Sequence, residues 1–259
     1  MLKDITVGQF YSVKSPIHEL DSRVKIRFVL VYIILSLLDR NLYQFGLLSF
    51  VCLFAVFLSN VPIRHMLKGM RGIILFIMLC SLINSFTVYG EVIFSLGALD
   101  ITVEGVLKSI YVFWRMILII LMASLLMYTT TPTELTDGLE KCFALKGNVA
   151  MGITIALRFI PVLMEELGRI MKAQEMRGAE FGKGGPIRRI KSLRTVIIPL
   201  FQNSIDRAKC LAEAMDSRCY SGGKNRTKLR PLRYTAIDGV VYILLLVLLI
   251  VGIYFIIKF

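Results

Sequence analysis

The sequence predicts an all-α membrane protein with about five transmembrane helices and two long amphipathic helices outside the membrane. Of its 259 residues, 56% are hydrophobic and 19% are charged, which is more apolar than ordinary soluble domains. Several runs nearly free of charge approach the roughly 18 to 20 residues that cross a hydrocarbon core. Most of the net positive charge lies in one polar segment near the C-terminus.

Five apolar runs are candidate membrane spans. The first becomes long enough to cross if Lys25 and Arg27 extend their side chains to the interface. The start of the chain has no early apolar core and no small-residue cleavage site, so we expect no signal peptide. In order, the candidate spans are Phe28 to Leu38, Asn41 to Ile63, Gly72 to Gly90, Met116 to Thr133 and Gly239 to Ile257.

Charged residues between these runs predict the topology. Lysines and arginines near the start, from Lys3 to Arg27, indicate a cytoplasmic N-terminus. The stretch EVIFSLGALDITVEG, Glu91 to Gly105, has only acidic charges and alternates apolar with polar residues, which favours a short hairpin or an interfacial helix. Arg115 directly precedes the run Met116 to Thr133 and lies close to the outer end of a predicted helix near Ser109 to Thr131, where it must face other helices, water or headgroups.

The region after Thr131 is expected to stay on the cytoplasmic side. TELTDGLEK is typical of a short polar helix that Thr133 could cap. The apolar segment Gly147 to Met164 is flanked by two segments that we expect to be cytoplasmic, so it cannot make a single crossing. We expect it to lie along or dip into the membrane face, interrupted by Arg158 and Pro161.

The segment from Leu167 to Tyr234 holds sixteen Lys and Arg against five acids, and thus +11 of the net charge of +13. The enrichment of cytoplasmic segments in Lys and Arg accounts for most of this charge. No RNA-binding or helix-turn-helix signature accompanies it, so nucleic acid is not an expected partner. The stretch MRGAEFGKGG lacks the spacing and hydroxyl of a phosphate-binding loop, so we do not expect an ATPase.

Two amphipathic helices are predicted in this basic segment, one after Pro161 and one after Pro199, because proline suits a first helical turn. Both end in an arginine among small residues. These end signatures are Met176, Arg177 and Gly178, then Ser217, Arg218 and Cys219. The arginines could bind lipid headgroups or complement a helix dipole. Alternatively, each end inserts into a groove of a soluble partner, where a guanidinium recognises a carboxylate.

The same residues carry a resemblance to a known family. ALRFIPVLMEELGRIMKAQEMRG, then IPLFQNSIDRAKCLAEAMDSRCYSGG and RTKLRPLRYTAID, resemble the transmembrane T component of energy-coupling factor (ECF) transporters, the CbiQ/EcfT family. The opening SPIHELDSRVKIRFVLVYIILSLL is also similar to the start of that family. The most specific part of the resemblance is Leu157 to Asp238.

The resemblance implies a non-catalytic coupling scaffold in the plasma membrane of a prokaryote. In that family, two cytoplasmic helices end in Ala-Arg-Gly signatures that dock onto two ABC-type ATPases, identical or different, while the membrane part grips a small substrate-binding S component for vitamin or metal-ion uptake. By position, Arg177 and Arg218 would be the coupling arginines. This chain departs from the pattern at Met176, Ser217 and Cys219, and Cys219 would fill space that glycine leaves empty.

We therefore expect three regions: an N-terminal membrane region over residues 1–133, a coupling region over 134–235 and a final transmembrane helix over 236–259. No catalytic residue, cofactor or metal site is predicted, and the five cysteines are expected to stay reduced. The alternative is a membrane-embedded enzyme acting on a lipid or prenyl substrate. Asp137, Glu140, Glu165 and Glu166 do not form the clustered acids that would bind magnesium in such an enzyme.

Overall fold

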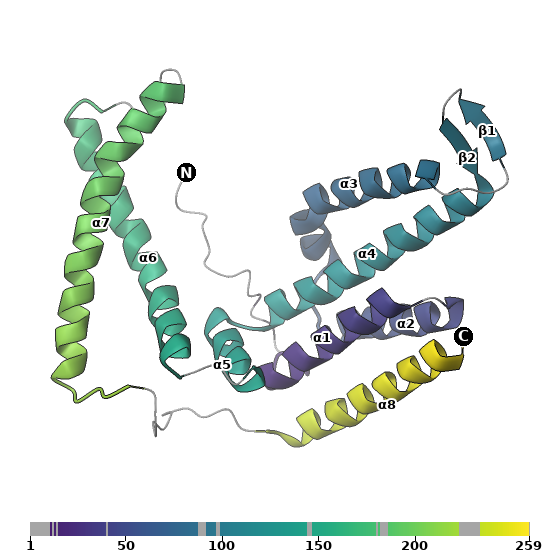
Figure 1. Cartoon of the computed structure of the whole chain (residues 1–259). Helices are drawn as coiled ribbons and strands as arrows, with labels where there is room; N and C mark the ends of the chain where they lie inside the picture. Colours follow the sequence, from purple (N-terminus) through teal and green to yellow (C-terminus); the bar gives the residue numbers. More distant parts are fainter. Residues whose placement is uncertain are drawn as a thin grey trace. The chain divides into compact units, whose positions relative to one another are not determined.

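The computed structural model describes residues 11, 13, 15–39, 41–87, 92–96, 99–143, 147–179, 181, 186–222 and 234–258. These residues form eight α-helices and one two-stranded hairpin (Figure 1). The chain divides into two compact units. We call residues 9–138 together with 232–259 the membrane unit, and residues 139–231 together with 1–8 the coupling unit. Residues 182–185, at the end of the stretch MRGAEFGKGG, and the basic stretch at 224–233 lie outside the described residues.

Five long helices make up most of the membrane unit, and each overlaps one of the five predicted spans, although their bounds differ. They are α1 (Ser22–Leu38), α2 (Leu42–Leu58), α3 (Ile63–Thr87), α4 (Val103–Thr129) and α8 (Ala236–Lys258). Of these, α4 and α8 are long and apolar enough to cross a bilayer, whereas the apolar parts of α2 and α3 are shorter. In the coupling unit, α6 (Gly147–Met176) also meets this criterion of length and composition over residues 148–176.

The outward faces of these helices are apolar. Phe57 on α2 is 81% exposed, and Leu75 on α3 and Val240 on α8 also point away from the protein. So much exposed hydrocarbon would favour aggregation in water, but it matches the apolar medium of a bilayer. The core of the unit lies between α1, α2 and α4, where Tyr32, Cys52 and Leu118 are almost completely buried.

At the N-terminal end of α1, polar side chains join three helices. Asp238, in the first turn of α8, is fully buried and accepts hydrogen bonds from the Thr235 hydroxyl (2.9 Å) and backbone N–H (2.7 Å). It also accepts a hydrogen bond from the backbone N–H of Asp21 (2.9 Å), the N-cap residue of α1. Lys25 of α1 donates to the carbonyl of Thr129 (2.9 Å), the last residue of α4. Each of these bonds has one charged partner, the carboxylate of Asp238 or the ammonium group of Lys25, which makes it stronger than a bond between two neutral groups.

Arg115 faces other helices. Its guanidinium donates to the backbone carbonyl of Asp39, after α1, and to the Tyr111 hydroxyl (3.0 Å) one turn away on α4. The Tyr111 hydroxyl in turn donates to the carboxylate of Asp39 (2.6 Å). Asn41, before α2, donates to the carbonyl of Phe255 on α8 (3.3 Å). This network ties four helices together, so the structure gives Arg115 a structural role.

The acidic stretch before α4 is a hairpin, one of the two predicted possibilities. Strand β1 (Val92–Leu96) pairs antiparallel with β2 (Leu99–Thr102), with Leu96 opposite Leu99 and an irregularity after Val92. Thr102 ends the hairpin and caps α4 by accepting the N–H of Gly105 (3.1 Å).

The polar helix α5 (Pro132–Cys142) forms as predicted, but the prediction that Thr133 caps it is wrong. Thr131 is the cap: its hydroxyl accepts the N–H of Glu134 (3.3 Å), whose carboxylate accepts the N–H of Thr131 (3.2 Å). This reciprocal pair is a capping box. The helix starts one residue after Thr131 because Pro132 fits the first helical position.

In the coupling unit, α6 and α7 (Pro186–Asp216) cross and run in opposite directions (Figure 1). We predicted that Pro161 and Pro199 begin these helices and that Arg158 and Pro161 interrupt the segment after Gly147, and both predictions are wrong. The helices continue through both prolines. An interior proline removes one hydrogen bond without ending a helix when the flanking turns are favourable. Pro186 occupies the first position of α7 instead.

Candidate functional site

The first end signature closes α6 with a Schellman motif. The N–H of Ala179 donates to the carbonyl of Gln174 (2.9 Å), and the N–H of Gly178 donates to that of Glu175 (2.9 Å). Gly178 has a φ of +86°, and no heavy atom lies within 4 Å of where its Cβ would be. The backbone conformation, rather than space, therefore favours glycine here. Arg177 is the residue directly before this left-handed turn.

The second signature has the same backbone motif. The N–H of Tyr220 donates to the carbonyl of Met215 (3.0 Å), and the N–H of Cys219 donates to that of Asp216 (2.9 Å). Cys219 has a φ of +58°, so it takes the left-handed position that Gly178 takes in the first signature. A side chain in this conformation is strained by about 1 to 2 kcal/mol. Arg218 therefore corresponds to Arg177 in backbone position as well as in sequence.

Both signatures are open to solvent. Met176 is 90% exposed, and Arg177, Ser217, Arg218 and Cys219 are exposed as well. Within the described ranges, no hydrogen bond or ion pair joins the side chain of Arg177 or Arg218 to the rest of the chain. A large thioether fully in water beside an uncommitted guanidinium is typical of a surface that binds a partner, since Met and Arg are enriched at interfaces.

The two signatures are far apart on the helix pair. Near the crossing, Glu166 of α6 accepts a hydrogen bond from Asn203 (3.0 Å) and pairs with Arg207 (3.5 Å), both on α7. Arg177 lies eleven residues beyond Glu166, and Arg218 lies eleven residues beyond Arg207, about 16 Å along each helix axis. The helices run in opposite directions, so their C-terminal ends lie at opposite ends of the pair (Figure 1). Arg177 and Arg218 each follow one of these ends.

A further observation fixes this arrangement. A Cβ at Gly222, just after the second signature, would lie 3.8 Å from the side-chain oxygen of Asn148, near the start of α6. Gly222, six residues after the end of α7, therefore lies beside the beginning of α6, away from Arg177. The sequence predicts both signatures, but it does not predict this separation.

Sequence reasoning missed the crossing residues and the strained turn. In the sequence, Glu166 is one of four acids that do not form a magnesium-binding cluster. In the structure, its carboxylate joins α6 to α7. Neither Asn203 nor Arg207 carries a motif, because contacts between helices leave no fixed spacing in sequence. One feature of the sequence indicates the positive φ of Cys219. This residue occupies the position that Gly178 occupies in the first signature.

Comparison with known proteins is consistent with a transport component. The sequence model of the CbiQ family, described as cobalt transport protein, matches residues 13–229. The chain is 42% identical over 248 residues to the energy-coupling factor transporter transmembrane protein EcfT of Ruminiclostridium cellulolyticum, covering 93% of each chain.

Two other relatives have the same name. The EcfT protein of Thermosediminibacter oceani is 40% identical over 249 residues, covering 93% of this chain and 94% of its own. That of Brevibacillus brevis is 38% identical over 259 residues, covering 97% and 98%. These matches span both units, and they place the sequence among non-catalytic transporter components rather than enzymes.

Proposed function

The chain belongs to the CbiQ family, which includes the transmembrane EcfT proteins of energy-coupling factor transporters, and from this membership we propose that it couples two cytoplasmic ATPases to a membrane S component. In this proposal the assembly imports a vitamin or a metal ion across the plasma membrane of a prokaryote. The chain performs no chemistry itself. It transmits movement from the ATPases, which hydrolyse ATP, to the subunit that binds the substrate.

The observation that carries this proposal is the repeated helix end. Two exposed arginines occupy the same position of the same backbone motif, at opposite ends of one helix pair. A lipid-binding role would require both arginines to reach one membrane face. Two separated and equivalent ends instead match a partner that offers the same groove twice, as a dimer of ABC-type ATPases does.

Each docking contact is proposed to use the arginine of a signature together with its neighbouring side chains. The guanidinium of Arg177 or Arg218 presents a planar fork to a carboxylate in the groove. At the first signature, Met176 adds an apolar anchor, because its 90% exposed side chain would be buried by the partner. At the second, Ser217 is small enough for close approach of the partner backbone, whereas Cys219 fills space that a glycine would leave empty.

The crossing explains how movement would pass between the sites. Long helices resist bending, and α6 and α7 are joined by Glu166, Asn203 and Arg207. When the ATPases bind ATP and close, the two helix ends move relative to each other and the crossing angle changes. Such coupling requires the open and closed ATPase dimers to hold the helix ends in different geometries.

The deciding experiment is co-purification of the tagged chain from its native membrane with mild detergent, followed by mass spectrometry. We expect two ATPase subunits and one small membrane protein in the wild-type sample. The double variant Arg177→Ala/Arg218→Ala should lose the ATPases while it keeps the small membrane protein. Retention of both ATPases by the double variant would rule out docking through these arginines.

A further inference from the structure

The chain passes between the membrane unit and residues 139–231 of the coupling unit at two places, residues 138–139 and residues 231–232. The first place lies on α5, and the second lies four residues before the start of α8. Force from α6 and α7 that travels along the backbone must enter the membrane unit at one of these places. The contacts that hold them therefore decide which part of the membrane unit is moved.

At the first place, α5 rests on the start of α1. A Cβ atom at Gly138 would lie 2.8 Å from the Oγ atom of Ser22 and 2.8 Å from the Cδ1 atom of Ile26, so even one methyl group would push against α1. Ser22 and Ile26 lie four residues apart on the same face of α1, and both are buried. Close-packed contacts of this kind have little compressibility and transmit displacement.

At the second place, the chain is held by the residues on either side of Ser22. The guanidinium carbon of Arg23 lies 4.0 Å from the centre of the Tyr234 ring, a cation–π contact, and the same guanidinium pairs with the carboxylate of Asp21 (2.7 Å). The carboxylate of Asp238 accepts the backbone N–H of Asp21 (2.9 Å). Tyr234 and Asp238 thus fasten the chain that returns from the coupling unit to the same turn of α1 that α5 contacts.

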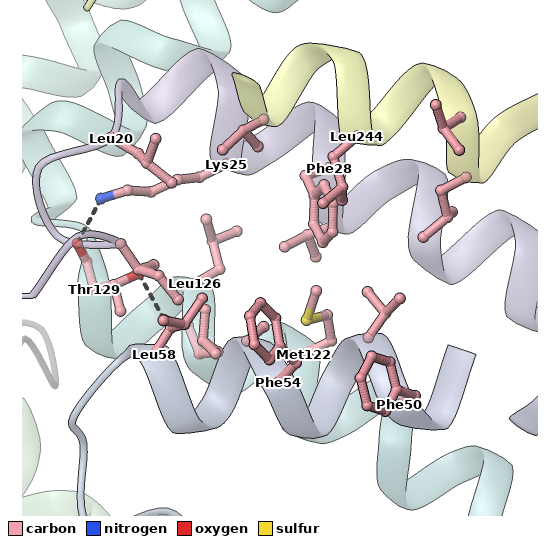
Figure 2. A pocket seen from close by; sticks show the side chains of 18 of the residues that line it. Leu20, Lys25, Phe28, Phe50, Phe54, Leu58, Met122, Leu126, Thr129 and Leu244 are labelled. Atoms are coloured by element: carbon pink, nitrogen blue, oxygen red, sulfur yellow. Dashed lines mark hydrogen bonds between the residues drawn. The ribbon is translucent and has the colours of Figure 1, made fainter. Parts of the chain in front are cut away.

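The start of α1 is in turn joined to other membrane helices. Lys25 donates to the carbonyl of Thr129 (2.9 Å), the last residue of α4, at the edge of the apolar pocket shown in Figure 2. Along its length, α1 also contacts α2, α4 and α8. A displacement of the start of α1 therefore reaches all three helices.

We propose that the start of α1, residues 21–26, is where movement of the coupling unit enters the membrane unit. This inference rests on the proposed function, in which closure of the ATPases moves α6 and α7. Both connections of the coupling unit converge on this short segment, although the whole of α6 and α7 lies between them in sequence. Residues 21–26 are thus positioning residues, which act through the helices that they hold.

The test uses the assembly of the full chain with its ATPases and S component, reconstituted in nanodiscs. Spin labels at Lys172 of α6 and Glu213 of α7 report movement of the coupling unit, and both residues are exposed. Labels at Leu30 of α1 and Leu75 of α3, which are also exposed, report movement of the membrane unit. Both distances are measured without nucleotide and then with ATP and vanadate, which trap ABC-type ATPases in the closed state.

The variant Gly138→Ala/Tyr234→Ala loosens both connections, because it adds a methyl group between α5 and α1 and removes the ring from Arg23. Gly239→Ala/Tyr254→Ala is the matched control. A Cβ atom at Gly239 meets no heavy atom within 4 Å, and Tyr254 is as exposed as Tyr234, at 55% and 54%. Tyr234→Ala alone is a second test variant, because removal of a half-exposed ring leaves the fold intact.

We expect ATP and vanadate to change both distances in the wild type and in the control, by about 1 to 2 Å or more, the size of helix shifts in allosteric proteins. Gly138→Ala/Tyr234→Ala should keep the change in the coupling unit and lose most of the change in the membrane unit. Tyr234→Ala alone should lose part of it.

Test variants whose membrane unit responds like that of the wild type would overturn the proposal, as would a wild type that moves only in the coupling unit. An equal loss in the control would also overturn it, because the effect would not depend on these contacts. A wild type whose coupling unit does not respond to ATP and vanadate would contradict the proposed function itself.

Discussion

The carboxylate of Asp238 at the start of α8 accepts a hydrogen bond of 2.9 Å from the backbone N–H of Asp21, which lies 217 positions earlier in the chain. The same carboxylate accepts hydrogen bonds from the backbone N–H and the hydroxyl of Thr235, the residue before α8. One buried side chain thus caps its own helix and anchors that helix to the start of α1. This contact brings the last predicted span against the first.

Asp238→Ala is therefore expected to destabilise the membrane unit. It removes a helix cap, worth about 1 kcal/mol, and leaves the buried N–H of Asp21 without an acceptor, at a further cost of about 1 to 3 kcal/mol. Thermal unfolding in detergent, followed by circular dichroism, should show a lower midpoint. Thr235→Ala removes a donor and leaves the Asp21 contact intact, so it should lower the midpoint less. Equal midpoints for wild type and Asp238→Ala would contradict this account.

Arg177→Ala is expected to weaken ATPase binding while the fold stays intact. Substitutions of exposed residues usually change stability by less than about 0.5 kcal/mol. Truncation of an arginine that anchors an interface costs about 2 kcal/mol or more, which is roughly 30-fold in affinity. Binding of the purified ATPases to the chain in nanodiscs measures this loss directly.

Two variants control that measurement. Arg177→Lys keeps the charge but not the planar fork, so it should bind nearly as weakly as the alanine variant. Arg169→Ala removes an equally exposed arginine that pairs with Glu165 on α6 (2.6 Å), and it should bind like wild type. If Arg169→Ala were as weak as Arg177→Ala, the effect would be one of net charge.

Gly178→Ala is expected to destabilise the turn that ends α6, and Cys219→Gly is expected to stabilise the turn that ends α7. Both residues have a positive φ, so alanine at 178 adds strain and glycine at 219 removes it, by about 1 kcal/mol each. Hydrogen exchange of the Ala179 and Tyr220 amides reports the two turns, because these N–H groups close them. Exchange should become faster at Ala179 and slower at Tyr220. Slowing at Ala179 in Gly178→Ala would refute the strain argument.

Glu166→Arg is expected to loosen the crossing of α6 and α7, because it places like charges opposite Arg207. A partly exposed ion pair contributes only about 0.2 to 1 kcal/mol to stability, so the free energy of unfolding should change little. The distance distribution between spin labels at positions 176 and 217 should broaden. Glu166→Arg combined with Arg207→Glu restores opposite charges and should narrow it again. A distribution that stays broad in the double variant would show that this pair does not hold the crossing.

The sequence by itself determined the class of protein and the places where its chemistry lies. Long apolar runs have one low-energy environment, the bilayer, so composition and spacing were enough to predict the spans that became α1, α2, α3, α4 and α8. The alternating pattern after α3 favoured a hairpin or an interfacial helix, and the structure has the hairpin. The helix-end signatures were visible because they consist of adjacent residues, and local backbone motifs depend mainly on local sequence.

Only the tertiary structure decided what depends on residues far apart in the chain. Pro161 and Pro199 lie inside helices because favourable flanking turns outweigh one missing hydrogen bond each, a balance that local rules do not predict. The opposite placement of Arg177 and Arg218 follows from the antiparallel crossing of α6 and α7. The Asp238 contact arises where α1 and α8 meet, because packing brings together side chains that no motif connects.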